Sequence, residues 1–333
     1  MAVDSDVLIV TKQLAQWFPI RIYAREAQTM VDWCRLGDER FDEPFFSQTV
    51  LRCLRHPFNL AFRKQTPIEA LPGCLAAEGR LEPSGFIFHL SRSGSTLVGR
   101  TLGALDGAFV ISEPPPVDTI LRASLPGAND ETRAEWLRGL IGALGRRWQG
   151  NERRYFVKFD AWAARHVGLI ARAFPGVPWI FLYRDPLEVV VSHQRQVTYF
   201  MSPDAAPSFF GIDVASAVRI PPFEYQARVL AQIMQDVLES NPEPKRLVNY
   251  NELPSAIWDR VAPLFGVVPT GAEVERMRAL AGVDVKAPSQ RFQPDAGMKW
   301  ETADAALRAA VDRYARPLYE ELERQRLLSR AGA

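Results

Sequence analysis

The sequence predicts an α/β protein whose mainly parallel sheet is flanked by helices on both faces. Two observations lead to this fold class. Short apolar segments that read as buried strands alternate along the chain with segments that read as helices. One apolar segment, Gly85–Leu90, runs directly into a turn of serine and glycine residues that opens a helix. Alternating strands and helices build parallel sheets, and the ligands of such sheets lie beyond the carboxyl ends of the strands.

The first eighty residues are expected to form a helical extension, 1–80, that packs on the α/β domain, 81–333. Several apolar and aromatic residues in this region are spaced for one face of an amphipathic helix. They are Trp17, Phe18, Ile22, Met30 and Trp33. The proline and glycine at 72–73 and the polar segment 78–83 then favour a boundary before the α/β domain.

Strands and helices are then expected in turn. After the turn that follows Gly85–Leu90, a helix should reach about Leu105. The remaining expected elements are strand Ala108–Ser112, helices 117–124 and 131–148, strand Tyr155–Lys158, a strand and helix within Val177–Ser192, a short strand from Arg246, and a final helix Ala303–Leu327. Charged residues fall at or just beyond several of the strand ends, where a parallel sheet binds its ligand.

The turn after Gly85–Leu90 has the build of an anion-binding loop. Backbone N–H groups at a helix N-terminus have no intrahelical partner and carry the positive end of the helix dipole. The glycine permits close approach of the backbone, and the hydroxyl groups add donors. The candidate contacts are Arg92, Ser93, Gly94, Ser95 and Thr96. An ordinary connection between strand and helix is the alternative interpretation.

A second segment, Val177–Ser192, reads as a buried strand followed at once by a helix, with Pro186 in the first helical turn. Arg184 lies at the end of the strand, and Ser192 lies further along the helix. Taken alone, Arg184 could pair with Asp185 and Ser192 could face solvent. In chain order after the first turn, the two residues make a second candidate phosphate site.

These two segments resemble a known family. The turn lacks the lysine of nucleotide-triphosphate loops and instead has Arg92 near its start. It resembles the 5′-phosphosulfate loop of sulfotransferases that use 3′-phosphoadenosine 5′-phosphosulfate (PAPS). Arg184 and Ser192 resemble the 3′-phosphate motif of the same family. The resemblance implies a P-loop-type α/β fold, PAPS as donor, adenosine 3′,5′-bisphosphate as product, and no metal.

A third segment, Arg246–Leu253, resembles the family's Arg-Tyr-Glu-Asp-Leu element. In that element the tyrosine lies near the adenosine, which makes Tyr250 a candidate cofactor contact. Asn251 and Glu252 depart from the family's pattern, which has Glu and Asp at these positions.

The transfer of a sulfuryl group needs a base for the acceptor's proton and a cation for the leaving oxygen. The distance of Glu113 from the loop arginine resembles that of the catalytic glutamate of tyrosylprotein sulfotransferases, so Glu113 is the first candidate for the base. Asp160 is the rival, because Lys158-Phe-Asp160 resembles the Lys-x-His element of cytosolic sulfotransferases, although an unperturbed Asp is a weaker base than His at neutral pH. Lys158 is the candidate cation. As alternatives, Glu113 could simply open the next helix and Lys158 could be an exposed lysine at a strand end.

Two further segments are assigned to the cofactor and the acceptor. The polar stretch 288–300 resembles the Ser-to-Lys closing segment of tyrosylprotein sulfotransferases, which makes Ser289 and Lys299 candidate cofactor contacts; a linker to the final helix is the alternative. The long segment Val197–Phe223 is rich in proline and aromatic residues and is expected to be a lid or acceptor-binding loop. The acceptor, a small molecule or a peptide, and the oligomeric state are left open.

Composition excludes other classes of protein. The formal net charge of +1 at pH 7 gives no reason to expect nucleic acid as a partner. Cys34, Cys53 and Cys74 are odd in number and lack metal-site spacing, which favours free thiols in a reducing compartment. No basic segment precedes the apolar run near the start, and no apolar run approaches the length needed to span a membrane. We therefore expect a cytoplasmic protein without membrane insertion.

Two other functions compete with sulfuryl transfer. A P-loop kinase-like phosphotransferase would depend on ATP and magnesium, and the missing loop lysine weighs against it. A non-catalytic protein would bind adenosine 3′,5′-bisphosphate and transfer nothing. Because Glu113, Lys158 and both phosphate motifs occur together, the enzyme is favoured.

Overall fold

The central sheet contains five parallel strands in the order β5-β6-β4-β7-β8. The computed structural model describes residues 14, 16–76, 79–205, 207–240, 246–283 and 303–331. The strands are β4 (Gly85–His89), β5 (Ala108–Ser112), β6 (Arg154–Lys158), β7 (Trp179–Tyr183) and β8 (Leu247–Asn249). The prediction of an α/β protein with a mainly parallel sheet is confirmed, and each expected strand of the domain is found within two residues of its predicted start.

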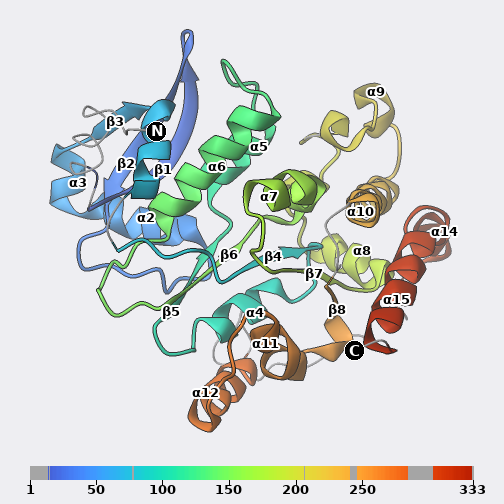
Figure 1. The fold of residues 1–333 in the computed structure, drawn as a ribbon. Helices are drawn as coiled ribbons and strands as arrows, with labels where there is room; N and C mark the ends of the chain where they lie inside the picture. Colours follow the sequence, from blue (N-terminus) through green and yellow to red (C-terminus); the bar gives the residue numbers. More distant parts are fainter. Residues whose placement is uncertain are drawn as a thin grey trace.

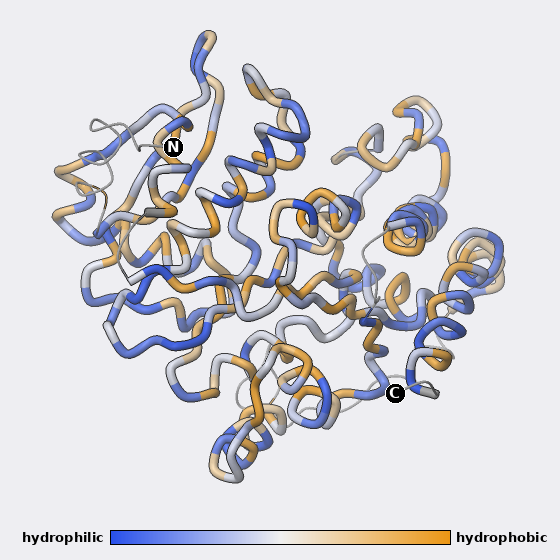
Figure 2. The backbone as a smooth tube through the Cα atoms, in the orientation of Figure 1, coloured by the Kyte–Doolittle hydropathy of each residue, from blue (hydrophilic) through white to orange (hydrophobic). Residues whose placement is uncertain are grey.

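Helices cover both faces of this sheet (Figure 1), also as predicted. One face carries α5 (Pro115–Arg122), α6 (Asp130–Leu144), α7 (Val167–Ala173), α8 (Pro186–Arg195) and α10 (Pro222–Glu239). The other carries α4 (Ser95–Leu102), the π-helical turn Ile257–Val261, α11 (Ala262–Leu264) and α12 (Gly271–Ala281). Successive side chains of β4 point to opposite faces of the sheet. Phe86 and Phe88 pack in the apolar cluster that includes α6, and Ile87 packs in the cluster that includes α4. In Figure 2 the hydrophobic colour accordingly gathers on the strands and on the helix faces turned toward them.

The N-terminal region is not the helical extension that the sequence predicted. It contains an antiparallel sheet of β1 (Trp17–Arg25), β2 (Gln28–Arg35) and β3 (Lys64–Pro67), with two helices, α2 (Phe46–Arg55) and α3 (Pro57–Ala61), between β2 and β3. The register of β1 against β2 shifts between Pro19 and Arg21. This bulge interrupts the alternation of buried and exposed residues, and the neighbouring Phe18 and Pro19 are both buried. Phe18 and Ile22 are four residues apart, a spacing that a strand and a helix face share, so it did not distinguish the two.

This N-terminal sheet shares a core with the α/β domain. Strand β1 packs against α5 and α6, and the short helix Pro72–Ala76 packs against α6. Phe18 and Val31 belong to the same apolar cluster as the inner face of α6. The boundary at residue 80 stays a prediction.

The C-terminal part departs from prediction in one detail. Two helices, α14 (Ala305–Tyr314) and α15 (Arg316–Ala331), stand where one helix was expected. Pro317 explains the break, because proline is tolerated only in the first turn of a helix. The segment after α8 contains three short helices, Tyr199–Met201, Pro207–Phe210 and α9 (Val214–Ala217).

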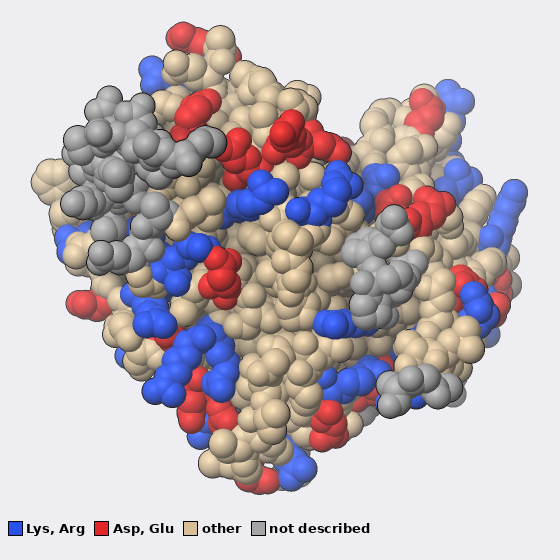
Figure 3. Space-filling view, in the orientation of Figure 1, with Lys and Arg blue, Asp and Glu red and all other residues tan. Residues whose placement is uncertain are grey.

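The face of the molecule that Figure 3 shows carries charges of both signs. Lys and Arg side chains lie among Asp and Glu there, in keeping with the net charge of +1. In the part of the chain that the structure describes, every helix is too short or too polar to cross a bilayer.

Candidate active site at the carboxyl edge of the sheet

The loop between β4 and α4 exposes helix N–H groups at the carboxyl edge of the sheet. Gly94 is the N-cap of α4 and has a left-handed backbone, with φ 87°, and Arg92 also has a positive φ, 61°. The N–H of Val98 donates to the Gly94 carbonyl at 3.1 Å. The N–H groups of the first helical residues, Ser95 to Leu97, therefore have no acceptor within the helix. This geometry is compatible with a bound anion, and the anion site stays a prediction.

Gly94 is required for a second reason, which is packing. A Cβ atom at this position would lie 2.7 Å from Leu253 Cδ1 and 3.1 Å from Tyr250 Cδ2. Any side chain here would therefore push the segment after β8 away from the loop. The third motif found in the sequence thus lies directly against the first.

Two loop residues are already engaged within the protein. The buried Ser93 hydroxyl donates to the Leu90 carbonyl at 2.7 Å, so it closes the turn and is not a free donor for an anion. Arg92 Nη2 donates to the carbonyl of Gln196 at 2.7 Å, at the C-terminal end of α8. Partial burial lowers the pKa of Arg92. Among the described residues, nothing accepts a hydrogen bond from the buried Arg92 Nε, which leaves this donor for a ligand.

Arg184, at the end of β7, lies next to the loop through Tyr250. Its Nε donates to Glu188 at 2.5 Å, and its guanidinium lies 3.9 Å from the centroid of the Tyr250 ring. Ser192 follows Glu188 by one turn of α8 and so lies on the same side of that helix. Tyr250 therefore contacts both Gly94 of the first candidate motif and Arg184 of the second.

The three catalytic candidates meet at the ends of β5 and β6. Lys158 Nζ donates to Glu113 Oε1 at 2.5 Å, and the lysine side chain is fully buried. The alternative of an exposed strand-end lysine is therefore wrong for Lys158. The Glu113 side chain contacts this lysine, and the N-cap of α5 is Pro114. Burial, and then the charge of Glu113, raise the pKa of Asp160 to about 6.

Two polar residues beside this pair were not assigned a role from the sequence. Asp118, in the first turn of α5, has its pKa raised well above the usual range by burial and then by Asp160 and Glu113. His89 Nε2 lies 3.8 Å from Glu113 Oε1, and burial and then the charge of Lys158 lower the pKa of His89 to about 4. The sequence feature that could have identified His89 is its position at the end of the strand before the loop.

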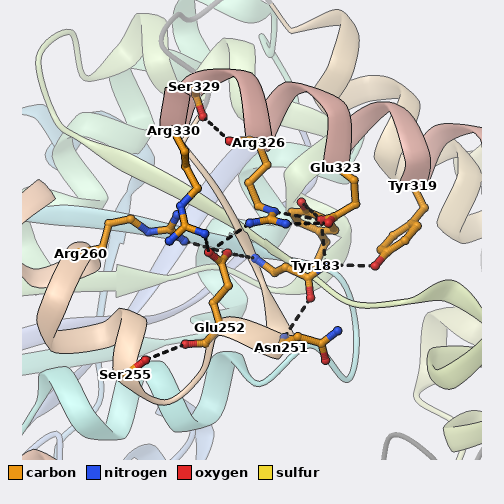
Figure 4. A network of polar contacts seen from close by, with 11 residues as sticks. Tyr183, Asn251, Glu252, Ser255, Arg260, Tyr319, Glu323, Arg326, Ser329 and Arg330 are labelled. Carbon is orange, nitrogen blue, oxygen red and sulfur yellow. Dashed lines mark hydrogen bonds and ion pairs between the residues drawn. The ribbon is translucent and has the colours of Figure 1, made fainter. Parts of the chain in front are cut away.

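Glu252, where the family element has Asp, holds the C-terminal helix. Its carboxylate pairs with Arg260 at 2.9 Å, with Arg326 at 3.2 Å and with Arg330 at 2.9 Å. Figure 4 shows these arginines converging on it from the turn Ile257–Val261 and from α15. This residue therefore supports the segment that carries Tyr250. The remaining candidates, Ser289 and Lys299, lie outside the described residues.

No protein-family model matches the chain, and no curated protein matches it. Among solved structures, sulfotransferase STF9 from Mycobacterium avium is similar with a TM-score of 0.46 and 13% identity, over 95% of this chain and 97% of that one. The sulfotransferase domain from the curacin biosynthetic pathway is similar with a TM-score of 0.42 and 19% identity, over 72% and 98%. That of the Synechococcus PCC 7002 olefin synthase has 0.42 and 16%, over 73% and 96%. At these identities and TM-scores the comparisons assign no activity, so the function is argued from the site itself.

Proposed function

We propose that this protein transfers a sulfuryl group from PAPS to a hydroxyl or amine acceptor. The observation that carries the proposal is the continuity of two separate anion-binding elements. The N–H groups at the start of α4 and the Arg184 guanidinium lie on either side of Tyr250, which contacts both Gly94 and Arg184. A nucleotide with phosphate groups at both the 5′ and 3′ positions of its ribose matches two such elements.

The residues present fit this cofactor. The N–H groups of Ser95 and Thr96 and the unpartnered Nε of Arg92 would hold the 5′ side, and Arg184 with Ser192 the 3′ phosphate. Tyr250 would contact the adenosine. When bound, PAPS supplies an activated sulfuryl group and, as its leaving group, the 5′-phosphate of adenosine 3′,5′-bisphosphate.

Glu113 would act as the general base, and Lys158 as the cation that stabilises the leaving group. The Glu113 carboxylate would take the proton of the acceptor's hydroxyl or amine. The Lys158 ammonium would stabilise the negative charge that develops on the leaving oxygen. Asp160 is the alternative base, and its raised pKa of about 6 brings it nearer to neutral pH than an unperturbed aspartate.

Thermal denaturation with added nucleotides tests the proposal. A ligand that binds the native state raises the melting temperature, so adenosine 3′,5′-bisphosphate should give a larger shift than AMP or ATP with magnesium. Ser192→Ala should reduce this shift without disturbing the Arg184–Glu188 pair, and Ser329→Ala, on α15, is the matched control. A shift with ATP and magnesium alone would instead favour a kinase-like phosphotransferase.

The second step is turnover. Radiolabelled or mass-resolved sulfuryl transfer from PAPS to a panel of hydroxyl and amine compounds distinguishes an enzyme from a protein that only binds the nucleotide. Selective binding without transfer to any acceptor, in a protein whose Glu113→Gln variant binds equally well, would favour the non-catalytic alternative.

A further inference from the structure

Two of the three cysteines lie against each other in the N-terminal region. Cys34 is in β2 and Cys53 is in α2, and each residue is 1% exposed. The Cys34 Sγ donates to the Arg35 carbonyl at 3.7 Å. The Cys53 Sγ donates to the Leu36 carbonyl at 3.9 Å. Because these two carbonyls are consecutive in the chain, Cys34 and Cys53, the thiol pair, both lie where the chain leaves β2.

A buried amide fixes the main chain on both sides of the thiol pair. Asn59, in α3, is 6% exposed. Its Nδ2 donates to the Arg35 carbonyl at 2.9 Å and to the Cys53 carbonyl at 2.8 Å, and its Oδ1 accepts from the Arg35 N–H at 3.0 Å. One side chain therefore holds the end of α2 against the end of β2. A satisfied polar network in the interior is rigid, so the two sulfur atoms are kept in proximity.

The two thiols also interact directly. A hydrogen bond between them raises the pKa of Cys34 and lowers the pKa of Cys53. Burial adds to the rise at Cys34, whereas at Cys53 burial opposes the hydrogen bond and the charge of Arg52 supports it. The thiolate is the nucleophilic form of cysteine. Cys53 is therefore the nucleophile of the thiol pair, and Cys34 is the thiol that keeps its proton.

Cys74 is a buried thiol of a different kind. It is 0% exposed, and its Sγ donates to the Ala70 carbonyl at 3.8 Å. Burial raises its pKa, and Arg146 is the charged group that acts on it. Cys74 is therefore an internal control for a thiol that is buried without a neighbouring thiol.

We propose that Cys34 and Cys53 form a redox-active pair, which a hydroperoxide converts into a disulfide. The Cys53 thiolate attacks one oxygen of hydrogen peroxide, the O–O bond breaks, and water leaves, so that Cys53 becomes a sulfenic acid. The Cys34 sulfur then displaces the hydroxyl group as a second water and forms the S–S bond. The two thiols lose two electrons and two protons in total, and the peroxide is reduced to water. A dithiol reductant reverses the reaction.

The disulfide would fasten a segment that reaches the candidate active site. It would close the chain around the loop 36–44 and Phe45, whose ring lies 5.1 Å from Lys158 Nζ. Arg52, next to Cys53, already binds this loop through Glu39 at 3.1 Å. The oxidation itself needs neither nucleotide nor acceptor, so the inference goes beyond the proposed function and does not depend on it.

Peptide mapping after mild oxidation tests the proposal. The native full-length protein is treated with a small excess of hydrogen peroxide, denatured, alkylated with iodoacetamide and digested with trypsin. Trypsin places the three cysteines in separate peptides, 26–35, 53–55 and 65–80. The expected result is loss of alkylation at Cys34 and Cys53, a linked peptide of 26–35 with 53–55, and full alkylation of Cys74. Dithiothreitol should restore alkylation of all three.

Two serine variants sharpen the test. Cys74→Ser should form the same disulfide with the same yield as the parent, and Cys53→Ser should leave Cys34 alkylated. Gel electrophoresis without reductant should show a single chain, because the bond lies within one molecule. Full alkylation of Cys34 and Cys53 after peroxide, a bond that includes Cys74, or a bond between two chains would each overturn the proposal. The parent alone gives these outcomes, so they stand even where a variant fails to fold.

Discussion

Lys158 and Glu113 form an ion pair of 2.5 Å at the ends of neighbouring strands, although the lysine side chain has no exposed surface. The backbone reinforces the contact, because the Glu113 N–H donates to the Lys158 carbonyl at 2.7 Å. Glu113 also has a φ of 52°, which is uncommon for a residue other than glycine. Strain of this kind gathers at functional sites, where the surrounding structure holds it.

Glu113→Gln should abolish most of the turnover while leaving the cofactor site intact. The amide keeps the shape of the side chain but takes no proton, and the loss of a general base lowers kcat about 10²- to 10⁴-fold. The measurement is kcat for sulfuryl transfer together with the Kd of adenosine 3′,5′-bisphosphate. Glu82→Gln, a carboxylate that is 66% exposed, is the control. A kcat within twofold of the parent (about 0.4 kcal/mol) would transfer the role of base to Asp160.

The same ion pair predicts a non-additive effect on stability. Glu113→Gln leaves a buried ammonium without a countercharge, which costs about 3 kcal/mol or more. Adding Lys158→Met removes that charge, so the double variant should be more stable than Glu113→Gln alone. Urea denaturation of the two single variants and the double variant measures the coupling. Additive losses would mean that the two side chains do not share a charge interaction.

Asp160→Asn should stabilise the protein at neutral pH and not in acid. The folded-state pKa of about 6 lies above the ordinary 3.8, so the folded protein binds more protons than the unfolded chain between these values. Stability from this group therefore falls as the pH rises from about 4 to 6 and stays low above it. Asn removes that cost, on the order of 3 kcal/mol at pH 7. Denaturation at pH 4 and pH 7 measures the free energy of unfolding of the parent and the variant. The same difference between the two proteins at both pH values would contradict the prediction.

His89 should make the stability of the protein rise with pH, the opposite of Asp160, over part of the same pH range. Its pKa of about 4 in the folded state lies below the ordinary 6.5, so the ring is neutral when folded and the unfolded chain binds the extra proton. The contribution to stability is full above pH 6.5 and is lost as the pH falls to 4. Lys158 and Glu113 are the charged groups that face the ring. His89→Gln should therefore lose less stability than the parent between pH 6.5 and 4.

The readout for His89 is the pH dependence and not the stability at one pH. Its Nδ1 lies 2.9 Å from the Leu90 carbonyl oxygen and its Nε2 2.9 Å from that of Phe159, so any substitution also removes a contact between β4 and β6. His56→Gln, at the exposed start of α3, is the control for a histidine outside the site. A His89→Gln curve parallel to that of the parent would show that the ring does not titrate between the folded and unfolded states.

The sequence predicted the sheet because each of its strands is buried on both faces and bounded by a turn. A continuous apolar run such as Trp179–Tyr183 leaves little ambiguity about a strand. The N-terminal sheet was missed for a physical reason. Its first strand carries a bulge at Pro19–Arg21, which breaks the alternation that indicates a strand, and the four-residue spacing of Phe18 and Ile22 is common to strands and helices.

The sequence offered candidate site residues but not the contacts that these residues make. The motifs identify Arg184 and Glu113, but the partners that tune them come from elsewhere in the chain. Glu188 engages Arg184, and Phe45, from the N-terminal region, lies over Lys158. Such pairings between distant segments depend on the packing of helices and loops, which no local pattern encodes.

Glu252→Gln should loosen α15 from the sheet and weaken nucleotide binding indirectly. Its carboxylate joins Arg260 to Arg326, whose side chain is 10% exposed, while Arg330 is 53% exposed and contributes less. Leaving Arg260 without its carboxylate partner, and Arg326 with Glu323 alone, should cost about 1–3 kcal/mol. Because the Glu252 carboxylate also accepts the Asn249 N–H at 2.8 Å, directly before Tyr250, the Kd of adenosine 3′,5′-bisphosphate should rise. Glu320→Gln, exposed on α15, is the control, and hydrogen exchange of α15 is the direct measurement. Unchanged exchange in α15, with unchanged nucleotide affinity, would mean that Glu252 does not couple the helix to the site.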